Sequence, residues 1–158
     1  MLYMAKRKKK QNTQPFWRLV FLLYAALMFW LLFCRSWGWS SDQDYWQIVE
    51  QNLCLKPFDT ITRYANIILY YPHSSSFTHC FINLVGNVVM FIPAGWLLPR
   101  IFQKQRHYLI FLLTCFLTIL LVETVQLFTL LGCFDVDDII LNLAGMTLGY
   151  LLCVCRNK

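Results

Sequence analysis

The chain has 158 residues, of which 58% are hydrophobic and 14% are charged, and its formal net charge is +6. A soluble domain of this length must keep a wettable surface, so this composition excludes an ordinary soluble domain and favours a membrane protein. The positive charge lies mainly beside apolar stretches, where it signals topology and attracts anionic lipid, and it does not indicate nucleic-acid binding.

Four apolar stretches are long enough to cross roughly 30 Å of hydrocarbon, which takes about 20 residues of helix. The first, "FWRLVFLLYAALMFWLLFC", is predicted to be an uncleaved anchor, because bulky residues and no small-residue cleavage site follow it. The predicted segments are a basic cytoplasmic N-terminus (1–15), span one (16–34), an extracellular segment (35–79), span two (80–98), a cytoplasmic loop (99–107), span three (108–131), an extracellular acidic turn (132–138) and span four (139–155).

Orientation follows from Lys and Arg, which gather near the membrane on the side where loops are retained. They occupy the N-terminus, the loop after span two and the tail, and four spans bring these segments to one side. The predicted fold class is therefore all-α: an integral membrane four-helix bundle, N-in/C-in, with both termini cytoplasmic and a structured extracellular segment between helices 1 and 2. In that segment "DQDYWQIVEQNL" suits a short surface helix, and "TITRYANIILYYP" suits another interfacial element or a strand.

Polar side chains within the spans cost several kcal/mol unless they have a partner or a function. Glu123 lies eight residues before Leu131, about 12 Å below the surface at 1.5 Å per residue. The alternative to function is interhelical hydrogen bonding, at about 0.6 kcal/mol per bond, which predicts no common depth. The polar residues of spans two to four all fall in the outer half, beneath the acidic turn: Asn83, Asn87, Glu123, Gln126 and Asn142.

Glu123 is an ionisable group at a depth where function is the default hypothesis. It is protonated, or bonded to Gln126 and the asparagines, or it binds a cation or a cationic group of a substrate. The turn "GCFDVDDIILN" adds Asp135, Asp137 and Asp138, and Asp135 or Asp137 alone would cap span four, where the helix dipole favours negative charge. The three aspartates, with Glu123 and nearby amide oxygens, are also a candidate Mg²⁺ or Ca²⁺ site; no other cofactor is expected.

Small residues and proline indicate how the spans pack. Gly145 and Gly149 form a small-xxx-small face on span four, and Gly86 lies beside the asparagines of span two. Pro93 removes a backbone donor and predicts a kink that breaks span two in its inner half, while Gly95 lets another helix approach.

The seven cysteines show no CxxC pair and no metal-ligand spacing, so neither a zinc site nor a disulfide framework is indicated. One disulfide among Cys54, Cys80 and Cys133 is the alternative that stays open. No Ser or Cys with a nearby His is predicted as a nucleophile, so catalysis would require a carboxylate base or a metal-activated water.

Three ordered stretches resemble the VanZ-like family of small bacterial membrane proteins: "LKPFDTI", "INLVGNVVMFIPAGWLLP" and "ETVQLFTLLGCFDVDDIILNLAGMTLGY". The resemblance covers residues 52–152, and the ordered combination NxxGN, FxPxG, ExxQ and DxDDxxxNxxG is specific. Many members carry an Arg just before the first aspartate, where this chain has Cys133 or Phe134. The signature positions that match here are Asn83, Gly86, Asn87, Phe91, Pro93, Gly95, Glu123, Gln126, Asp135, Asp138, Asn142 and Gly145.

The resemblance implies a multi-pass protein of the bacterial cell membrane that contributes to resistance against the glycopeptide teicoplanin or lipoglycopeptides. Its expected partners are membrane lipids and a lipid-linked wall precursor or the drug itself, bound in an outer-leaflet polar pocket. The alternative is a membrane-embedded, metal-assisted enzyme that acts on a lipid-linked envelope substrate, with Glu123, Asp135 or Asp138 as catalytic candidates. A transporter or channel is disfavoured, because the inner halves of the spans lack polar lining. The predicted pocket residues are Asn83, Asn87, Glu123, Gln126, Asp135, Asp137, Asp138 and Asn142.

Overall fold

The structure is a computed structural model that describes residues 14–34 and 44–155. The basic run at residues 6–10 and the basic residues of the tail, on which the predicted orientation partly depends, lie outside the described residues. The elements in chain order are α1 (Gln14–Phe29), the π-helical η1 (Trp30–Cys34), α2 (Tyr45–Gln51), β1 (Leu53–Cys54), α3 (Asp59–Tyr70), α4 (Phe77–Ile101), the 3-10 helix η2 (Gln103–Arg106), α5 (Tyr108–Thr129), β2 (Phe134–Asp135) and α6 (Val136–Cys155).

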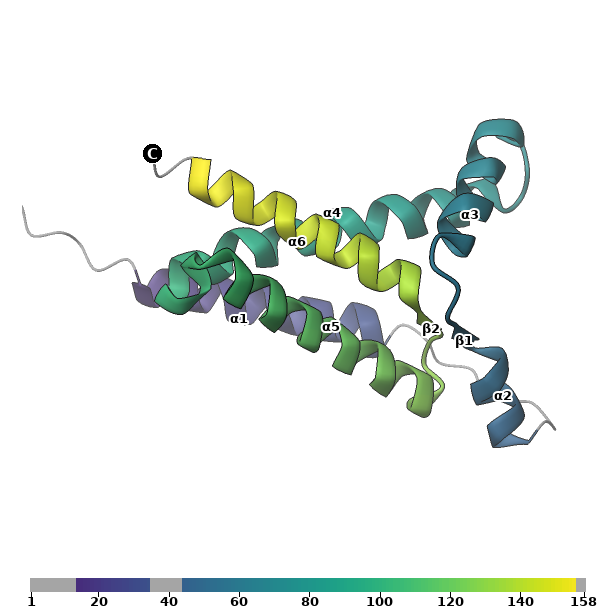
Figure 1. Cartoon of the computed structure of the whole chain (residues 1–158), viewed down its shortest axis with the longest axis horizontal. Coiled ribbons are helices and arrows are strands. Elements are labelled where there is room, and N and C mark those ends of the chain that lie inside the picture. The colour runs from purple at the N-terminus through teal and green to yellow at the C-terminus, as the bar shows by residue number, and fades with distance from the viewer. Residues whose placement is uncertain (1–13, 35–43, 156–158) are drawn as a thin grey trace, which may run out of the picture.

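Four helical segments are long and apolar enough to cross a membrane: Gln14–Cys34, Phe77–Ile101, Tyr108–Thr129 and Val136–Cys155. The prediction of an all-α fold with four such helices is therefore confirmed. Figure 1 shows α2, α3 and the β1–β2 pair together at one end of the long helices. The beginning of α1 and the end of α6 lie at the opposite end, as an even number of crossings requires.

The helices α4 and α6 touch backbone to backbone. Glycine is required at such a contact, because any side chain would hold the helices apart. Gly145 meets Val88 and Gly149 meets Ile92, four residues further along both helices, so α4 and α6 run parallel. A Cβ atom at any of three glycines would overlap a carbonyl oxygen of the other helix: Gly95 with Met146, Gly145 with Val88 and Gly149 with Ile92.

The predicted break in the second span is wrong, because α4 continues through Pro93 to Ile101. Proline lacks the N–H that would bond to the carbonyl four residues earlier, here that of Val89, so the helix loses one hydrogen bond at this turn without ending. The Tyr24 hydroxyl of α1 donates to the carbonyl oxygen of the next residue, Met90, at 2.8 Å and joins α1 to this part of α4.

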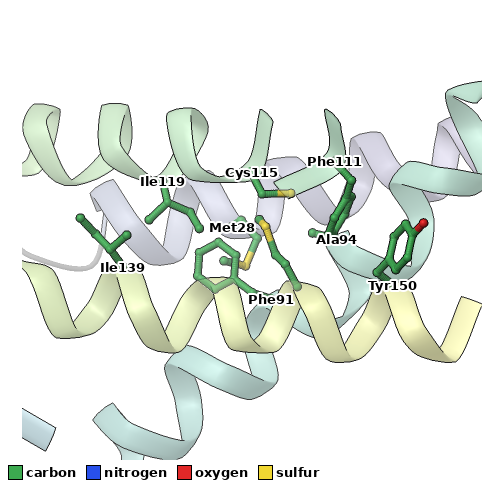
Figure 2. Close-up of a cluster of buried hydrophobic side chains, with 9 residues drawn as sticks. Met28, Phe91, Ala94, Phe111, Cys115, Ile119, Ile139 and Tyr150 are labelled. Atoms are coloured by element: carbon green, nitrogen blue, oxygen red, sulfur yellow. The ribbon is translucent and has the colours of Figure 1, made fainter. Parts of the chain in front are cut away.

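The hydrophobic core lies between the four long helices. Phe111, Cys115 and Ile119 recur every four residues on one face of α5 and are almost completely buried. Figure 2 shows this face turned toward Ile139 and Tyr150 of α6. The rings of Phe111 and Tyr150 are 4.8 Å apart. Many apolar side chains on the other faces are exposed, which is the arrangement that lipid contact requires.

The segment between α1 and α4 is structured where it is described. The predicted surface helix in "DQDYWQIVEQNL" is α2, and "TITRYANIILYYP", left open between helix and strand, contains α3. The strands β1 and β2 pair in parallel, with Leu53 opposite Phe134, and join this segment to the α5–α6 turn. All cysteines are free thiols, so the disulfide considered among Cys54, Cys80 and Cys133 is not formed.

Alanine at Gly145 is predicted to destabilise the protein, because its methyl group would collide with the α4 backbone at Val88. Forcing extra volume into a packed contact costs about 1–3 kcal/mol. Thermal unfolding in detergent should therefore show a lower midpoint for Gly145→Ala. Gly86→Ala is the matched control, since a methyl group at Gly86 would meet only Ile82, at 3.8 Å. It should leave the midpoint unchanged or raise it, and equal losses for both variants would contradict the assigned contact.

Candidate functional site

Polar side chains of α3, α4 and α6 contact one another where these helices meet. This is the end of the bundle that also carries α2, β1 and β2 (Figure 1). We call this end the acidic end, and the opposite end, where α1 begins and α4 meets α5, the basic end. The polar cluster at the acidic end consists of Thr60, Asn83, Asn87, Glu123, Asp135, Asp137, Asp138 and Asn142.

Asp135 caps α6 and also holds α3. Its Oδ1 accepts a hydrogen bond from the Asp137 backbone N–H at 2.8 Å, which is the helix cap that the sequence predicts. Its Oδ2 accepts from the Thr60 hydroxyl at 2.7 Å. Because of this cap, α6 begins at Val136, three residues before the predicted start of span four. Asp137 and Asp138 are therefore part of the helix rather than of the turn.

Asp137 is fully buried, with 0% of its surface exposed, and its carboxylate accepts hydrogen bonds from another helix, α3. Its Oδ1 accepts from the Phe58 N–H at 2.5 Å and its Oδ2 from the Ile61 N–H at 2.9 Å. Phe58 is the N-cap of α3, has a left-handed φ of 65° and provides no side-chain cap. The carboxylate from α6 thus replaces the missing cap, and Asp137 fixes α3 to the bundle.

Asp138 and Glu123 bring two more carboxylates together. Asp138 accepts a hydrogen bond from the Asn87 amide at 2.6 Å, which joins α6 to α4. Glu123 is 4% exposed, accepts from the backbone N–H of Asp135 and lies close to Asp138. Two carboxylates in such surroundings need a positive partner, which is either a proton or a cation.

Two asparagines supply further acceptors. The Oδ1 atoms of Asn83 and Asn142 are buried and have no hydrogen-bond partner among the described residues. Asn142 is only 4% exposed and lies one turn beyond Asp138 on α6. An unsatisfied buried acceptor costs about 1–3 kcal/mol, so this part of the cluster has an excess of acceptors over donors.

A divalent cation stays a prediction. Within residues 14–34 and 44–155, no three side chains of His, Cys, Asp or Glu form a group that could hold a metal ion. The three aspartates instead point to three partners, on α6 itself, on α3 and on α4. A cation near Glu123 and Asp138 would have to complete its ligands with the amide oxygens of the asparagines.

Gln126 does not join the cluster, although it lies three residues after Glu123. Its amide Nε2 donates to the carbonyl oxygen of Leu32 at 2.9 Å, in the π-helical end of the first span. Residues three apart on a helix differ by about 60° around its axis. Glu123 therefore faces α6 while Gln126 faces η1.

Thr60 and Arg63 belong to the site but are not among the predicted residues. Arg63 donates to the Thr60 hydroxyl at 3.4 Å, and Thr60 donates to Asp135, so a cation reaches the aspartates from α3. The signal that could have found these residues is "PFDT", where Asp and Thr after a proline are typical of a helix start.

The acids also affect the thiols beside them. Desolvation raises the pKa of Cys54, and the Asp135 carboxylate raises it further. Desolvation likewise raises the pKa of Cys133, with Cys54 and then Asp135 adding to the shift. The Cys133 thiol donates to the Asn52 side-chain oxygen at 3.4 Å. Both groups are therefore held as thiols, which makes them poor nucleophiles and poor metal ligands.

Comparison with known proteins gives one match. The family model described as VanZ/LLP1 matches residues 21–157, which include the whole polar cluster. No curated protein and no solved structure matches the chain.

Replacing Asp137 with alanine is predicted to release α3 from the bundle, because two backbone N–H groups lose their acceptor. Because hydrogen bonds to a buried charge are strong, the free energy of unfolding should fall by roughly 2–4 kcal/mol. Hydrogen–deuterium exchange should speed up at the start of α3 and leave α5 unchanged. Asp59→Asn is the matched control, since it removes an exposed acid from the same turn of α3. Faster exchange in the control alone would show that Asp137 is not the cap.

Proposed function

The chain belongs to the VanZ/LLP1 family, and from this premise we propose that it contributes to resistance against teicoplanin and lipoglycopeptides in the bacterial cell membrane. It does so by binding an amphiphilic ligand at the polar cluster, either a lipid-linked wall precursor or the drug. Membership of the family and four helices able to span a membrane fit a multi-pass membrane protein linked to glycopeptide resistance.

The excess of acceptors is the observation that supports this proposal most. The buried amide oxygens of Asn83 and Asn142 have no donor among the described residues, and the carboxylates of Glu123 and Asp138 lie close enough to repel each other. A ligand with an ammonium group or several N–H and O–H groups would supply the missing donors. Amino sugars, peptides and glycopeptides all carry such groups.

The surroundings of the cluster suit the apolar part of an amphiphile. A methyl group at Gly86 would meet only its own helix, and neighbouring Val85 is 41% exposed, so no other described helix packs against α4 on this side. Trp46, Tyr70 and Tyr71 at the same end are 61%, 72% and 63% exposed. Exposed aromatic rings are typical of the membrane–water interface. An acyl chain could therefore lie along α4 while its polar head reaches the cluster.

A second candidate is an enzyme that acts on a lipid-linked envelope substrate. The observation that favours it is the pair formed by Glu123 and Asp138, since two close carboxylates can share one proton and act as acid and base. Analysis of wall precursors and lipids in cells with and without the protein separates the two functions. A changed precursor or lipid would favour the enzyme.

Asn142→Leu is predicted to abolish protection without harming the fold. Leucine has the same branched shape and removes an acceptor that no described residue satisfies, so the melting temperature should stay the same or rise. If Asn142 binds the ligand, its affinity should fall on the order of tenfold, and cells should become as susceptible to teicoplanin as cells with an empty vector. Minimum inhibitory concentrations at matched protein levels provide the measurement.

Two further variants sharpen this experiment. Glu123→Gln and Asp138→Asn keep the shape of each side chain and remove its charge, and both should lose protection. Glu50→Gln removes an exposed acid from α2 and should keep it. Full protection by Asn142→Leu, Glu123→Gln and Asp138→Asn would show that these residues serve only helix capping and packing.

The proposed orientation places the acidic end outside the cell and both termini in the cytoplasm. Cys133 and Cys155 are exposed and lie at opposite ends of α6. A membrane-impermeant maleimide should therefore label Cys133 in intact cells and Cys155 only after permeabilisation, as read by peptide mass spectrometry. Because the pKa of Cys133 is raised, its thiolate fraction and its labelling should increase as the buffer becomes alkaline. Labelling of Cys155 alone in intact cells would reverse the orientation.

A further inference from the structure

Positive and negative side chains are separated along the bundle. All eight Asp and Glu residues lie at positions 42–59 and 123–138, and every one of these that is described lies toward the acidic end. The described basic side chains of the basic end include Arg18, Arg100, Lys104 and Arg106. No Asp or Glu side chain of the described residues can neutralise them there, so their counter-charge must come from another molecule.

Arg100 is held in a fixed orientation at this end. Its guanidinium lies 3.5 Å from the centre of the Trp96 ring and 5.2 Å from that of Trp17. The two indoles meet edge to face at 5.1 Å, so α1 and α4 together form the surface on which it stacks. Its Nε is buried and has no hydrogen-bond partner among the described residues. Stacking leaves the donors at the edge of a guanidinium available to a planar or tetrahedral anion.

Arg106 is held at the same end of α4. Its Nε donates to the carbonyl oxygen of Pro99 at 3.3 Å, and the Tyr150 hydroxyl donates to the Arg106 carbonyl at 2.6 Å. The side chain is exposed and bonds to the residue that precedes Arg100 in the chain. Both side chains are thus held at the end of α4, Arg100 by stacking on Trp96 and Trp17 and Arg106 by its bond to the Pro99 carbonyl.

We propose that Arg100 and Arg106 bind the phosphate of an anionic phospholipid in the leaflet at the basic end. The position favours a lipid over free phosphate, because the site lies at the end of two membrane-spanning helices and beside apolar side chains. Phe16, Leu19 and Phe102 are 58%, 56% and 47% exposed there and can contact acyl chains. This site shares no residue with the polar cluster, so its test is independent of the proposed function.

Native mass spectrometry of the full chain, released from detergent micelles containing phosphatidylglycerol and phosphatidylcholine, tests this site. The wild type should retain phosphatidylglycerol in preference to phosphatidylcholine. Arg100→Gln should weaken that retention about tenfold, as expected for the loss of charged hydrogen bonds. Arg100→Lys should also weaken it, because lysine keeps the charge and loses the stacked, forked geometry. Arg18→Gln, which removes an exposed charge from α1 at the same end, is the control and should retain the lipid.

Retention by Arg100→Gln equal to that by Arg18→Gln would overturn the proposal. Displacement of the lipid by millimolar inorganic phosphate would also overturn it, because the site would then bind free phosphate. If Arg100→Gln does not elute as a folded species, Arg106→Gln replaces it, with the same expected loss. Unchanged retention by Arg106→Gln would then decide against the site.

Discussion

The close contact between α4 and α6 is the constraint on which the polar cluster depends. Because Gly145 and Gly149 let the two backbones meet, the register between the helices is fixed. That register places Asp138 beside Asn87, and a hydrogen bond of 2.6 Å tolerates only a few tenths of an ångström of displacement. It also buries Asn142 one turn further along, where no donor of the described residues reaches its oxygen. Larger residues at these glycines would push α4 and α6 apart and would displace Asp138, Asn87 and Asn142 at the same time.

The density of acids at the acidic end follows from two helix N-termini that meet there. The beginning of α6 carries Asp135 and Asp137, and the beginning of α3 lies against the same carboxylates. Each N-terminus presents unpaired N–H groups and a partial positive charge, so both stabilise negative side chains. Arg63 adds a cation through Thr60. Asp138 and Glu123 lie further along the bundle, beyond these groups. Their negative charge is therefore the charge that a ligand would meet.

What the sequence predicts depends on how local each interaction is. The Asp135 cap spans two residues and follows from the helix-start pattern, and the four long helices follow from hydrophobic length. The contact between Asp138 and Asn87 could have been predicted from the sequence, because both residues lie at a similar depth in neighbouring spans. The partners of Asp137 lie 76 and 79 residues earlier in the chain, in a segment whose amphipathic character indicates only an interface.

Two further differences between prediction and structure, at Gln126 and at Pro93, also depend on contacts between helices that are distant in the sequence. Gln126 shares the depth of Glu123, but a turn of 60° directs it to a carbonyl of η1, and sequence spacing does not specify which neighbour a helix face meets. Pro93 removes the donor that would bond to the Val89 carbonyl, yet α4 continues to Ile101, packed against α6 and α1. The local preference of proline to end a helix is thus outweighed in a helix that is packed on two neighbours.

The separation of charge along the bundle makes its two ends act independently. On α4, Asn87 and Arg100 are 13 residues apart, which corresponds to about 20 Å along a helix. Salt screens exposed charges over roughly 8–10 Å, so the charges at one end have little electrostatic effect through water on those at the other end. The long helices, among them α4 with its backbone contact to α6, link the two ends. An amphiphile at the polar cluster and a phospholipid at Arg100 would therefore bind the same helix without competing, and loss of one would leave the other intact.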